Sequence, residues 1–244
     1  MPTALITGAN KGIGFATARK LGERGYAVWL ACRDEERGDE AAGTLRQSGI
    51  DATVVVLDVT DDASVDAAAA FVADRTDRLD ALVNNAGMHF GPPPPSTEEP
   101  VDQMRAIFDV NAFGPVRVTQ AFLPLLRASD APRVVMVSSG IGSLGMTLDP
   151  RTEDWGVGFA GYSASKAALN MFTVKLAMDL LADGFKVNAA DPGLTSTDLT
   201  GRAGDRTPDE AAEVVVALAT LDAFGPTGGF FHEAPDGRST GLPW

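Results

Sequence analysis

The segment "ALITGANKGIG", residues 4–14, decides the fold of this chain. It opens with a short apolar run that is typical of a buried strand, and a stretch with helical spacing follows at residues 14–25. Between them Gly8, Gly12 and Gly14 allow a tight turn and a close approach of the backbone to a ligand. A helix that opens behind such a turn presents free N–H groups and a positive dipole end, so the segment predicts a phosphate-binding loop.

Strand and helix patterns alternate along the rest of the chain. Further apolar runs lie at residues 27–32, 53–59, 81–87, 133–139 and 185–190, and a last apolar patch at 228–233 would add a seventh strand. Continuous apolar strands that alternate with helices are typical of a parallel sheet buried on both faces. The sequence therefore predicts an α/β fold with a doubly wound, seven-stranded parallel sheet in a single domain, residues 1–244.

Composition excludes several classes of function. The formal net charge of −13 argues against a general binder of nucleic acid or anionic membranes, which would need a basic face. Cys32 is the one cysteine, and His89 and His232 lie far apart in the sequence, so no metal site is expected and both histidines are expected to be non-catalytic. Neither a secretory leader nor an apolar run of about 18 residues is found, so we expect a cytoplasmic protein.

Four short motifs identify a family resemblance. "TGANKGIG" (7–14), "NNAG" (84–87), "YSASK" (162–166) and "DPG" (191–193) follow one another in the order found in short-chain dehydrogenases/reductases. The resemblance extends over nearly the whole chain, and with "ACRDEERG" (31–38) it is most similar to the carbonyl-reductase branch. It implies a Rossmann-type domain that binds a nicotinamide cofactor and a small-molecule carbonyl or alcohol substrate.

The resemblance places the end of the second strand against the adenosine ribose of the cofactor. Members that prefer NAD carry an acid there, whereas this chain has Cys32 followed by Arg33. A guanidinium can clamp a phosphate, and Lys11 would supply a second positive charge, so we expect NADP (NADPH). Two alternatives stay open: Arg33 and Lys11 are ordinary surface residues, or Asp34 pairs with Arg33 or reaches the ribose itself.

The remaining cofactor contacts are implied by the resemblance alone. Asp58 resembles a residue that meets the adenine amino group, although a capping acid at a strand end is equally compatible. Asn84 is similar to a residue that stabilises the central sheet, and Thr195 is a lesser candidate than Thr197 for the carboxamide. The expected cofactor-binding residues are Gly8, Asn10, Lys11, Gly12, Ile13, Gly14, Arg33, Asp58, Val59, Asn85, Ala86, Gly87, Tyr162, Lys166, Pro192, Gly193, Leu194 and Thr197.

The expected catalytic group centres on Tyr162 and Lys166, which lie one helical turn apart and so share a helix face. A free tyrosine has a pKa of about 10. A nearby ammonium and the positive nicotinamide ring would both favour the phenolate and lower this pKa. The resemblance implies that Tyr162 is the general acid/base and that Lys166 bonds the hydroxyls of the nicotinamide ribose. It also makes Ser139, rather than Ser138, the residue that bonds the substrate oxygen, and Asn111 the residue that kinks its helix and holds a water linked to Lys166.

These motifs predict NADPH-dependent hydride transfer to a ketone or aldehyde, or the reverse oxidation of a secondary alcohol. The alternatives are a catalytically silent NADP-binding regulatory protein and a relative that uses the same residues without net redox change. Apolar residues in the expected pocket segments favour an apolar carbonyl compound, and the polar segment 200–210 is expected to form a substrate lid.

One departure from the family pattern leaves the assembly open. Ser139 and Tyr162 lie 23 residues apart, and the extra residues fall in the segment 146–161, which we expect beside the substrate pocket. In this family the helices that carry Asn111 and Tyr162 commonly pair in dimers, and a large insertion can block that pairing. A homodimer or homotetramer is therefore compatible with the sequence.

Overall fold

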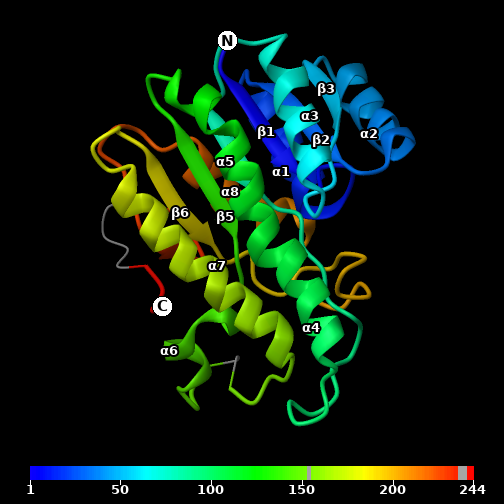
Figure 1. Ribbon diagram of the computed structural model, residues 1–244, viewed down its shortest axis with the longest axis vertical. Helices are drawn as coiled ribbons and strands as arrows, with labels where there is room; N and C mark the ends of the chain where they lie inside the picture. Colours follow the sequence, from blue (N-terminus) through cyan, green and yellow to red (C-terminus); the bar gives the residue numbers. More distant parts are fainter. Residues whose placement is uncertain (153–154, 236–240) are drawn as a thin grey trace.

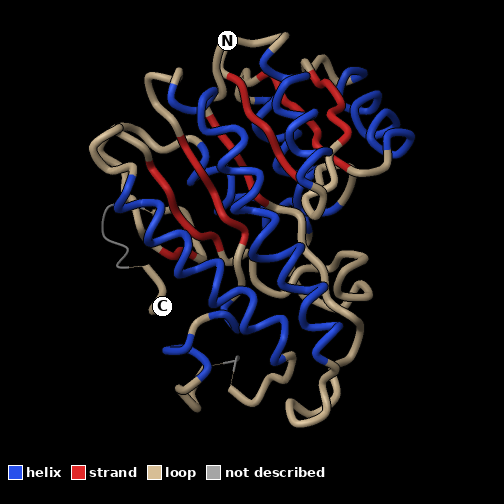
Figure 2. The backbone as a smooth tube through the Cα atoms, in the orientation of Figure 1, coloured by secondary structure: helices blue, strands red, loops and turns tan. Residues whose placement is uncertain are grey.

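Seven strands form one parallel sheet in the computed structural model, which describes residues 1–152, 155–235 and 241–244. The strands are β1 (Thr3–Thr7), β2 (Ala27–Cys32), β3 (Ala52–Val56), β4 (Ala81–Asn84), β5 (Arg133–Val137), β6 (Lys186–Ala190) and β7 (Phe230–Phe231). Their order is β3-β2-β1-β4-β5-β6-β7, and every pairing is parallel (Figure 2). The predicted fold class is confirmed. The order reverses between β1 and β4, where ligands bind at the carboxyl ends of the strands in sheets of this kind.

Helices cover both faces of this sheet (Figure 1). On one face lie α1 (Gly12–Glu23), α2 (Glu35–Gln47) and α8 (Pro208–Ala219); on the other lie α3 (Asp62–Ala73), α5 (Gly114–Arg127) and α7 (Ala160–Asp179). The helix α4 (Val101–Phe108) extends beyond the sheet and packs against α7 (Figure 1). The alternation of side chains along β1 supplies both interfaces, because Ala4 and Ile6 enter one core cluster and Leu5 enters the other. The strands are thus apolar on both sides, as their sequence predicted.

The long helical stretch before β5 is interrupted at Asn111, the residue that the family resemblance implied would kink its helix. Between α4 and α5 the residues Asp109–Phe113 form a wide π turn, and α5 restarts at Gly114, one residue before Pro115. Proline lacks an N–H donor, so it fits the first turn of a helix better than its middle. Turns of this kind often mark functional positions, and this one carries Asn111.

The segment 146–161 contributes little regular structure. A single helical turn, α6 (Leu144–Thr147), follows the short 3-10 turn Gly140–Gly142, and the part of the segment at Glu153 and Asp154 lies outside the described residues. In the described part of the chain, no helix has the length and apolar character needed to cross a membrane.

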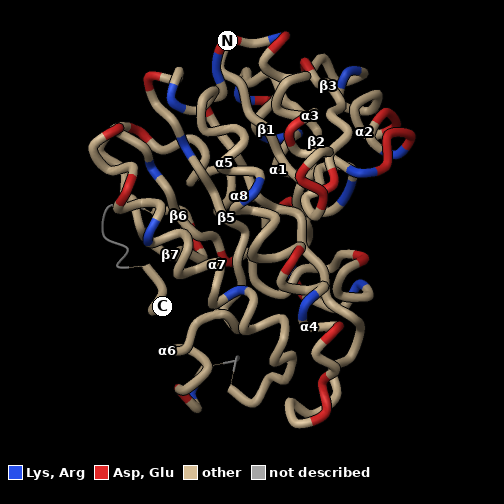
Figure 3. The backbone as a smooth tube through the Cα atoms, in the orientation of Figure 1, with Lys and Arg blue, Asp and Glu red and all other residues tan. Residues whose placement is uncertain are grey.

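Charged residues are spread over the fold instead of gathering on one face. Figure 3 shows Lys and Arg positions interspersed with Asp and Glu positions in the drawn view. Several basic side chains join elements through ion pairs; Arg19 on α1, for example, lies 2.8 Å from Asp209 on α8. The absence of a basic face from this view agrees with the net charge of −13.

Candidate active site

The loop between β1 and α1 depends on its glycines. Gly8 and Gly12 have positive φ angles of 65° and 57°, which side-chain-bearing residues rarely adopt. A Cβ atom on Gly14 would lie 2.5 Å from Asn85 Nδ2 and 2.6 Å from the Gly8 carbonyl oxygen, so a side chain does not fit there. The loop therefore leaves its backbone accessible in front of the first turn of α1, as phosphate binding requires.

Asn85 fastens this loop to the end of β4. Its side-chain amide donates to the carbonyls of Thr7 at 2.8 Å and Gly8 at 3.3 Å, while the Thr7 hydroxyl accepts from the Asn85 N–H at 2.9 Å. The neighbouring Asn84 is buried and donates to the Thr119 hydroxyl of α5 at 3.0 Å. Asn84 thus ties α5 to the sheet, and Asn85 fixes the relative position of the two strands on either side of the switch point.

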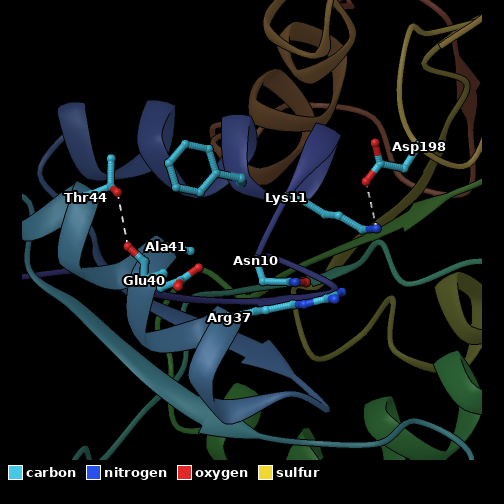
Figure 4. Close-up of a pocket in the computed structure, with 8 residues that line it drawn as sticks. Asn10, Lys11, Arg37, Glu40, Ala41, Thr44 and Asp198 are labelled. Carbon is cyan, nitrogen blue, oxygen red and sulfur yellow. Dashed lines mark hydrogen bonds and ion pairs between the residues drawn. The ribbon is translucent and has the colours of Figure 1, made fainter.

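A cavity of about 510 Å³ lies where the glycine loop meets α2 and the segment after β6 (Figure 4). Its walls include Asn10, Lys11, Arg37 and Asp198, and the Arg37 side chain extends alongside Asn10 toward the loop (Figure 4). Lys11 Nζ lies 2.9 Å from Asp198 Oδ2. Two basic side chains that converge on one cavity suit a phosphate group.

Arg37 also lines the cavity, although the sequence motifs pointed only to Arg33 and Lys11 as phosphate contacts. Asp34 caps α2 by accepting from the Arg37 N–H at 3.1 Å, and its carboxylate lies 3.3 Å from the Arg37 Nε. Asp34 therefore pairs with Arg37, not with Arg33 as one alternative held. Arg33 is exposed beside Asp58 and helps to lower the pKa of that carboxyl.

The Asp58 carboxylate has a local structural role. Its Oδ1 accepts from the Thr60 N–H at 2.9 Å and from the Thr60 hydroxyl at 2.7 Å, and these bonds are the main cause of its lowered pKa. This geometry matches the strand-end capping acid that the sequence analysis kept open. Contact with an adenine remains a prediction.

Tyr162, Lys166 and Ser139 converge at the carboxyl ends of β5 and β6. Lys166 Nζ lies 5.6 Å from the centre of the Tyr162 ring, one helical turn along α7, and the Ser139 side chain is near enough to Tyr162 to lower its pKa. Lys166 is buried, and its Nζ donates to the Val137 carbonyl at 2.7 Å. Ser138 is bonded elsewhere, since its hydroxyl donates to the side-chain oxygen Oδ1 of Asn170 at 2.6 Å. Ser139 is therefore the serine that meets Tyr162.

Burial controls the protonation of this group. It raises the pKa of Tyr162 to about 12, an effect that the negative charge of Asp191 increases and the nearby Ser139 side chain opposes. Burial also lowers the pKa of Lys166 to about 8. Lys166 is not among the causes that act on the tyrosine pKa, and its ammonium is bonded to the Val137 carbonyl instead of the phenol. The lowering expected from Lys166 together with the nicotinamide ring stays a prediction. At neutral pH the tyrosine holds its proton.

Asn111 joins three segments around this group. Its amide oxygen accepts from the Met88 N–H at 2.8 Å, and its Nδ2 donates to the Met88 carbonyl at 2.9 Å and the Ser165 hydroxyl at 3.1 Å. A Cβ on Gly87 would lie 3.5 Å from Asn111 Oδ1 and 3.7 Å from Lys166 Nζ, so both side chains border the same small space. The expected water between Asn111 and Lys166 stays a prediction.

The turn after β6 lies opposite the glycine loop. Gly193 has a φ of 68°, and the Thr195 hydroxyl is used within the turn, donating to the Gly193 carbonyl at 3.0 Å. Thr197 lies across the cleft, 3.5 Å from the position of a Cβ on Gly12, and Leu194 is 65% exposed. Of the two threonines considered for a carboxamide, Thr197 is the one beside the glycine loop.

His89 is a second residue that the sequence analysis did not assign to the site. Its ring packs edge-to-face against Tyr162 at 5.8 Å and against Phe159 at 5.1 Å, between ring centres. Its Nδ1 is buried with no hydrogen-bond partner among the described residues. Phe159 has a left-handed backbone with φ 68° immediately before α7, a conformation that costs about 1–3 kcal/mol in a side-chain-bearing residue. Nothing in the sequence links His89 to Tyr162.

Comparisons with known proteins agree with one another. Residues 2–208 match the family model of short chain dehydrogenases. The short-chain dehydrogenase anuI of Penicillium roqueforti is 38% identical over 227 residues, which cover 90% of this chain and 88% of that protein. The (−)-isopiperitenone reductase of Mentha piperita is 36% identical, with 93% and 95% covered. The solved structure of an NADPH-bound carbonyl reductase from chicken fatty liver has a TM-score of 0.84 at 28% identity, covering 100% of this chain and 99% of that one.

Proposed function

Because the chain belongs to the short-chain dehydrogenase family, we propose that it reduces a ketone or aldehyde with NADPH, or oxidises the corresponding alcohol. The observation that carries this proposal is the meeting of Ser139, Tyr162 and Lys166 at the sheet edge that also bears the glycine loop. Relatives that are named reductases, and a solved relative with bound NADPH, support the same reaction and cofactor.

The cradle for the cofactor fits a dinucleotide diphosphate. Gly8, Gly12 and Gly14 keep the start of α1 open, and the cavity beside it presents Lys11 and Arg37 to an anionic group. We assign these two cations to the 2′-phosphate that distinguishes NADP from NAD. Arg33, which does not line this cavity, is a further candidate for the same phosphate. The Pro192–Gly193 turn, Leu194 and Thr197 would face the nicotinamide end, and the Ala86–Gly87 backbone would lie near the ribose.

Bound NADPH would supply the hydride, and the chain must supply a proton and hold the carbonyl. A tyrosine with a pKa of about 12 is protonated at neutral pH, so Tyr162 suits the role of proton donor to the forming alkoxide. Ser139 would orient the substrate oxygen through a hydrogen bond. Lys166 would hold the ribose, and Asn111 would hold a water through which Lys166 returns a proton from solvent to Tyr162.

The experiment that tests this function is NADPH oxidation against a panel of apolar ketones and aldehydes, with Tyr162→Phe beside Ser163→Ala as a matched neighbour. Loss of the general acid should lower turnover by about 10²–10⁴-fold and leave NADPH binding intact. NADPH binding without turnover on any carbonyl would instead favour a regulatory binder or a reaction without net redox change.

We also infer that the chain pairs with a second copy through α5 and α7. Met171 and Met178 lie seven residues apart, hence on one face of α7, and they are 60% and 62% exposed. Phe113, which ends the π turn before α5, is 57% exposed. Three exposed apolar side chains at neighbouring helices favour a protein–protein contact.

A further inference from the structure

Three polar side chains that the proposed reaction does not use meet beside the Pro192–Gly193 turn. Asp191 follows β6, His232 follows β7 and Arg206 precedes α8. His232 Nδ1 lies 3.0 Å from Asp191 Oδ2, and its Nε2 lies 2.8 Å from a terminal guanidinium nitrogen of Arg206. Asp191 is buried, with 6% of its surface exposed.

The donors and acceptors of this cluster fix the state of the imidazole. A guanidinium only donates, so the Nε2 of His232 must accept from Arg206. Nδ1 then carries the one ring proton and donates it to the Asp191 carboxylate. The complete set of bonds therefore requires a neutral His232 with its proton on Nδ1.

This cluster is packed onto the turn itself. The second oxygen of Asp191, Oδ1, accepts from the Gly193 N–H at 3.1 Å. A Cβ on Gly193 would lie 3.0 Å from His232 Cε1 and 3.1 Å from Arg206 Cδ. The imidazole and the guanidinium stem thus limit the movement of the Gly193 backbone directly.

Arg206 also closes the loop that begins at this turn. The Ser196 N–H donates to the Arg206 carbonyl at 2.8 Å, and the Arg206 N–H donates to the Leu194 carbonyl at 3.4 Å. The two ends of the segment 194–206 therefore meet at Arg206, and the segment between them carries Thr197 and Asp198 to the glycine loop. The bond from Arg206 to His232 anchors this whole segment to the sheet.

We propose that His232 and Arg206 are positioning residues, in which neutral His232 anchors Arg206 and so fixes the Pro192–Gly193 turn and the 194–206 loop against the cofactor site. The proposal rests on the proposed function where it assigns that turn to the nicotinamide. A protonated His232 would set an N–H and a positive charge against the guanidinium, so the anchor would be lost and the loop released.

The charges around His232 place this change in an accessible range of pH. The charged groups that face it in the described chain are Asp191, Arg206 and Glu233. The hydrogen bond to Asp191 raises its pKa above the ordinary value more than burial and Arg206 lower it. Because the folded pKa is raised, protonation stabilises the fold at low pH, and this stabilisation is lost as the pH rises through the folded pKa. Release of the loop in mild acid therefore does not require unfolding.

The first experiment is amide hydrogen exchange of residues 194–206 in the full chain without added cofactor, at pH 5.5 and 8.0, corrected for intrinsic rates. We expect the loop of the unmodified chain to open about tenfold more at pH 5.5, which corresponds to one lost hydrogen bond. In Arg206→Met, which keeps the aliphatic stem, the loop should open at both pH values as much as the loop of the unmodified chain opens at pH 5.5. Arg202→Met is the matched control, since Arg202 is 75% exposed on the same loop and pairs with Asp198.

Two further readouts separate positioning from simple structural support. The chain has two histidines, so NMR titration resolves His232, and its pKa should rise in Arg206→Met because a cationic neighbour is gone. His232→Gln does not titrate near neutrality, so its loop exchange should no longer depend on pH. The ratio of the NADPH Kd of Arg206→Met to that of the unmodified chain should be about ten at pH 8.0 and near one at pH 5.5. Titration of the cofactor phosphate changes both Kd values equally, so its effect cancels in this ratio.

Equal loop exchange at both pH values in the unmodified chain would overturn the proposal, as would unchanged exchange in Arg206→Met. If the unmodified chain does not bind NADPH at all, the proposed function fails, while exchange and NMR still decide whether the anchor exists.

Discussion

Lys11 of the glycine loop and Asp198 of the loop after β6 form an ion pair of 2.9 Å across the mouth of the cofactor cleft. Each partner belongs to a segment that must contact the cofactor, and Arg37 also contributes to the lowered pKa of Asp198. The carboxylate therefore sits among the cations that we assign to a 2′-phosphate. It holds the cleft together in the absence of a cofactor, and it competes with the phosphate for Lys11.

Asp198→Asn should tighten NADPH binding and leave NADH binding nearly unchanged. The partners are about half exposed, so the gain is that of a surface ion pair, about threefold in Kd. Fluorescence titration of both cofactors measures it. Asp209→Asn, which removes an equally exposed partner of Arg19 away from the cavity, serves as the control. Weaker NADPH binding in Asp198→Asn would mean that the ion pair assists the cofactor instead of competing with it.

Arg37→Met should reduce the preference for NADPH over NADH. Removing one charge-assisted hydrogen bond to a phosphate is worth about 1.5–3 kcal/mol, so the ratio of the two kcat/KM values should fall at least about tenfold. The same change at exposed Arg24, at the end of α1, should leave that ratio unaltered. If Arg33→Met lowers the ratio and Arg37→Met does not, the cavity has been assigned to the wrong arginine.

Arg37 also illustrates which part of the site the sequence could predict. The motifs predicted the turn before α1 and the shared helix face of Tyr162 and Lys166, because each depends on short-range geometry: a turn before a helix, or one helical turn. The orientation of Arg37 depends on where α2 begins, and the Asp34 cap sets this. The sequence alone therefore does not tell Arg33 from Arg37 as a phosphate contact. Once α2 forms, the Arg37 side chain lines the cavity, whereas Arg33 lies beside Asp58.

Long-range contacts account for the other omissions. His89 meets Tyr162 only because the loop after β4 lies beside the start of α7. His232 meets Asp191 because β7 pairs with β6, and the loop before α8 brings Arg206 to them. The bonding of Lys166 depends on such a contact too: helical spacing places Lys166 on the same face as Tyr162, but the Val137 carbonyl decides where its ammonium is bonded.

The rate of carbonyl reduction should depend on the charge of Lys166. Burial lowers its pKa to about 8, so its positive charge is present below that pH and is lost as the pH rises through it. We expect kcat/KM for reduction to fall above about pH 8, while Tyr162 stays protonated up to about pH 12. The measurement is a pH profile between pH 6 and 10 with a carbonyl that does not titrate.

Lys166→Arg keeps a positive charge throughout this range, so any activity that survives should show no decline at pH 8. A decline at the same pH in Lys166→Arg would assign it to a different group.

Pairing through α7 should be sensitive to charge at its exposed face. Met171→Glu together with Met178→Glu would place two carboxylates per chain at the expected contact, and we expect sedimentation to show monomers. The control is Phe224→Glu, which alters a side chain that is 96% exposed and distant in sequence from α7. A monomer in the unmodified chain at micromolar concentration would remove the basis for this assembly.

His89 should determine how well the carbonyl substrate binds. Its ring packs against Tyr162 and Phe159, and its buried Nδ1 has no partner in the described chain. His89→Ala removes this wall beside Tyr162, and we expect KM for an apolar ketone to rise about tenfold while kcat changes less.

Phe90→Ala is the matched control, because Phe90 is the next residue and is 46% exposed. The NADPH Kd should stay the same in both variants, since neither side chain borders the glycine loop or the cavity with Lys11. If His89→Ala lowers kcat and leaves KM unchanged, His89 acts on the proton transfer of Tyr162 and not on substrate binding. The left-handed backbone of Phe159 would then serve to place the histidine against the tyrosine rather than to shape the pocket.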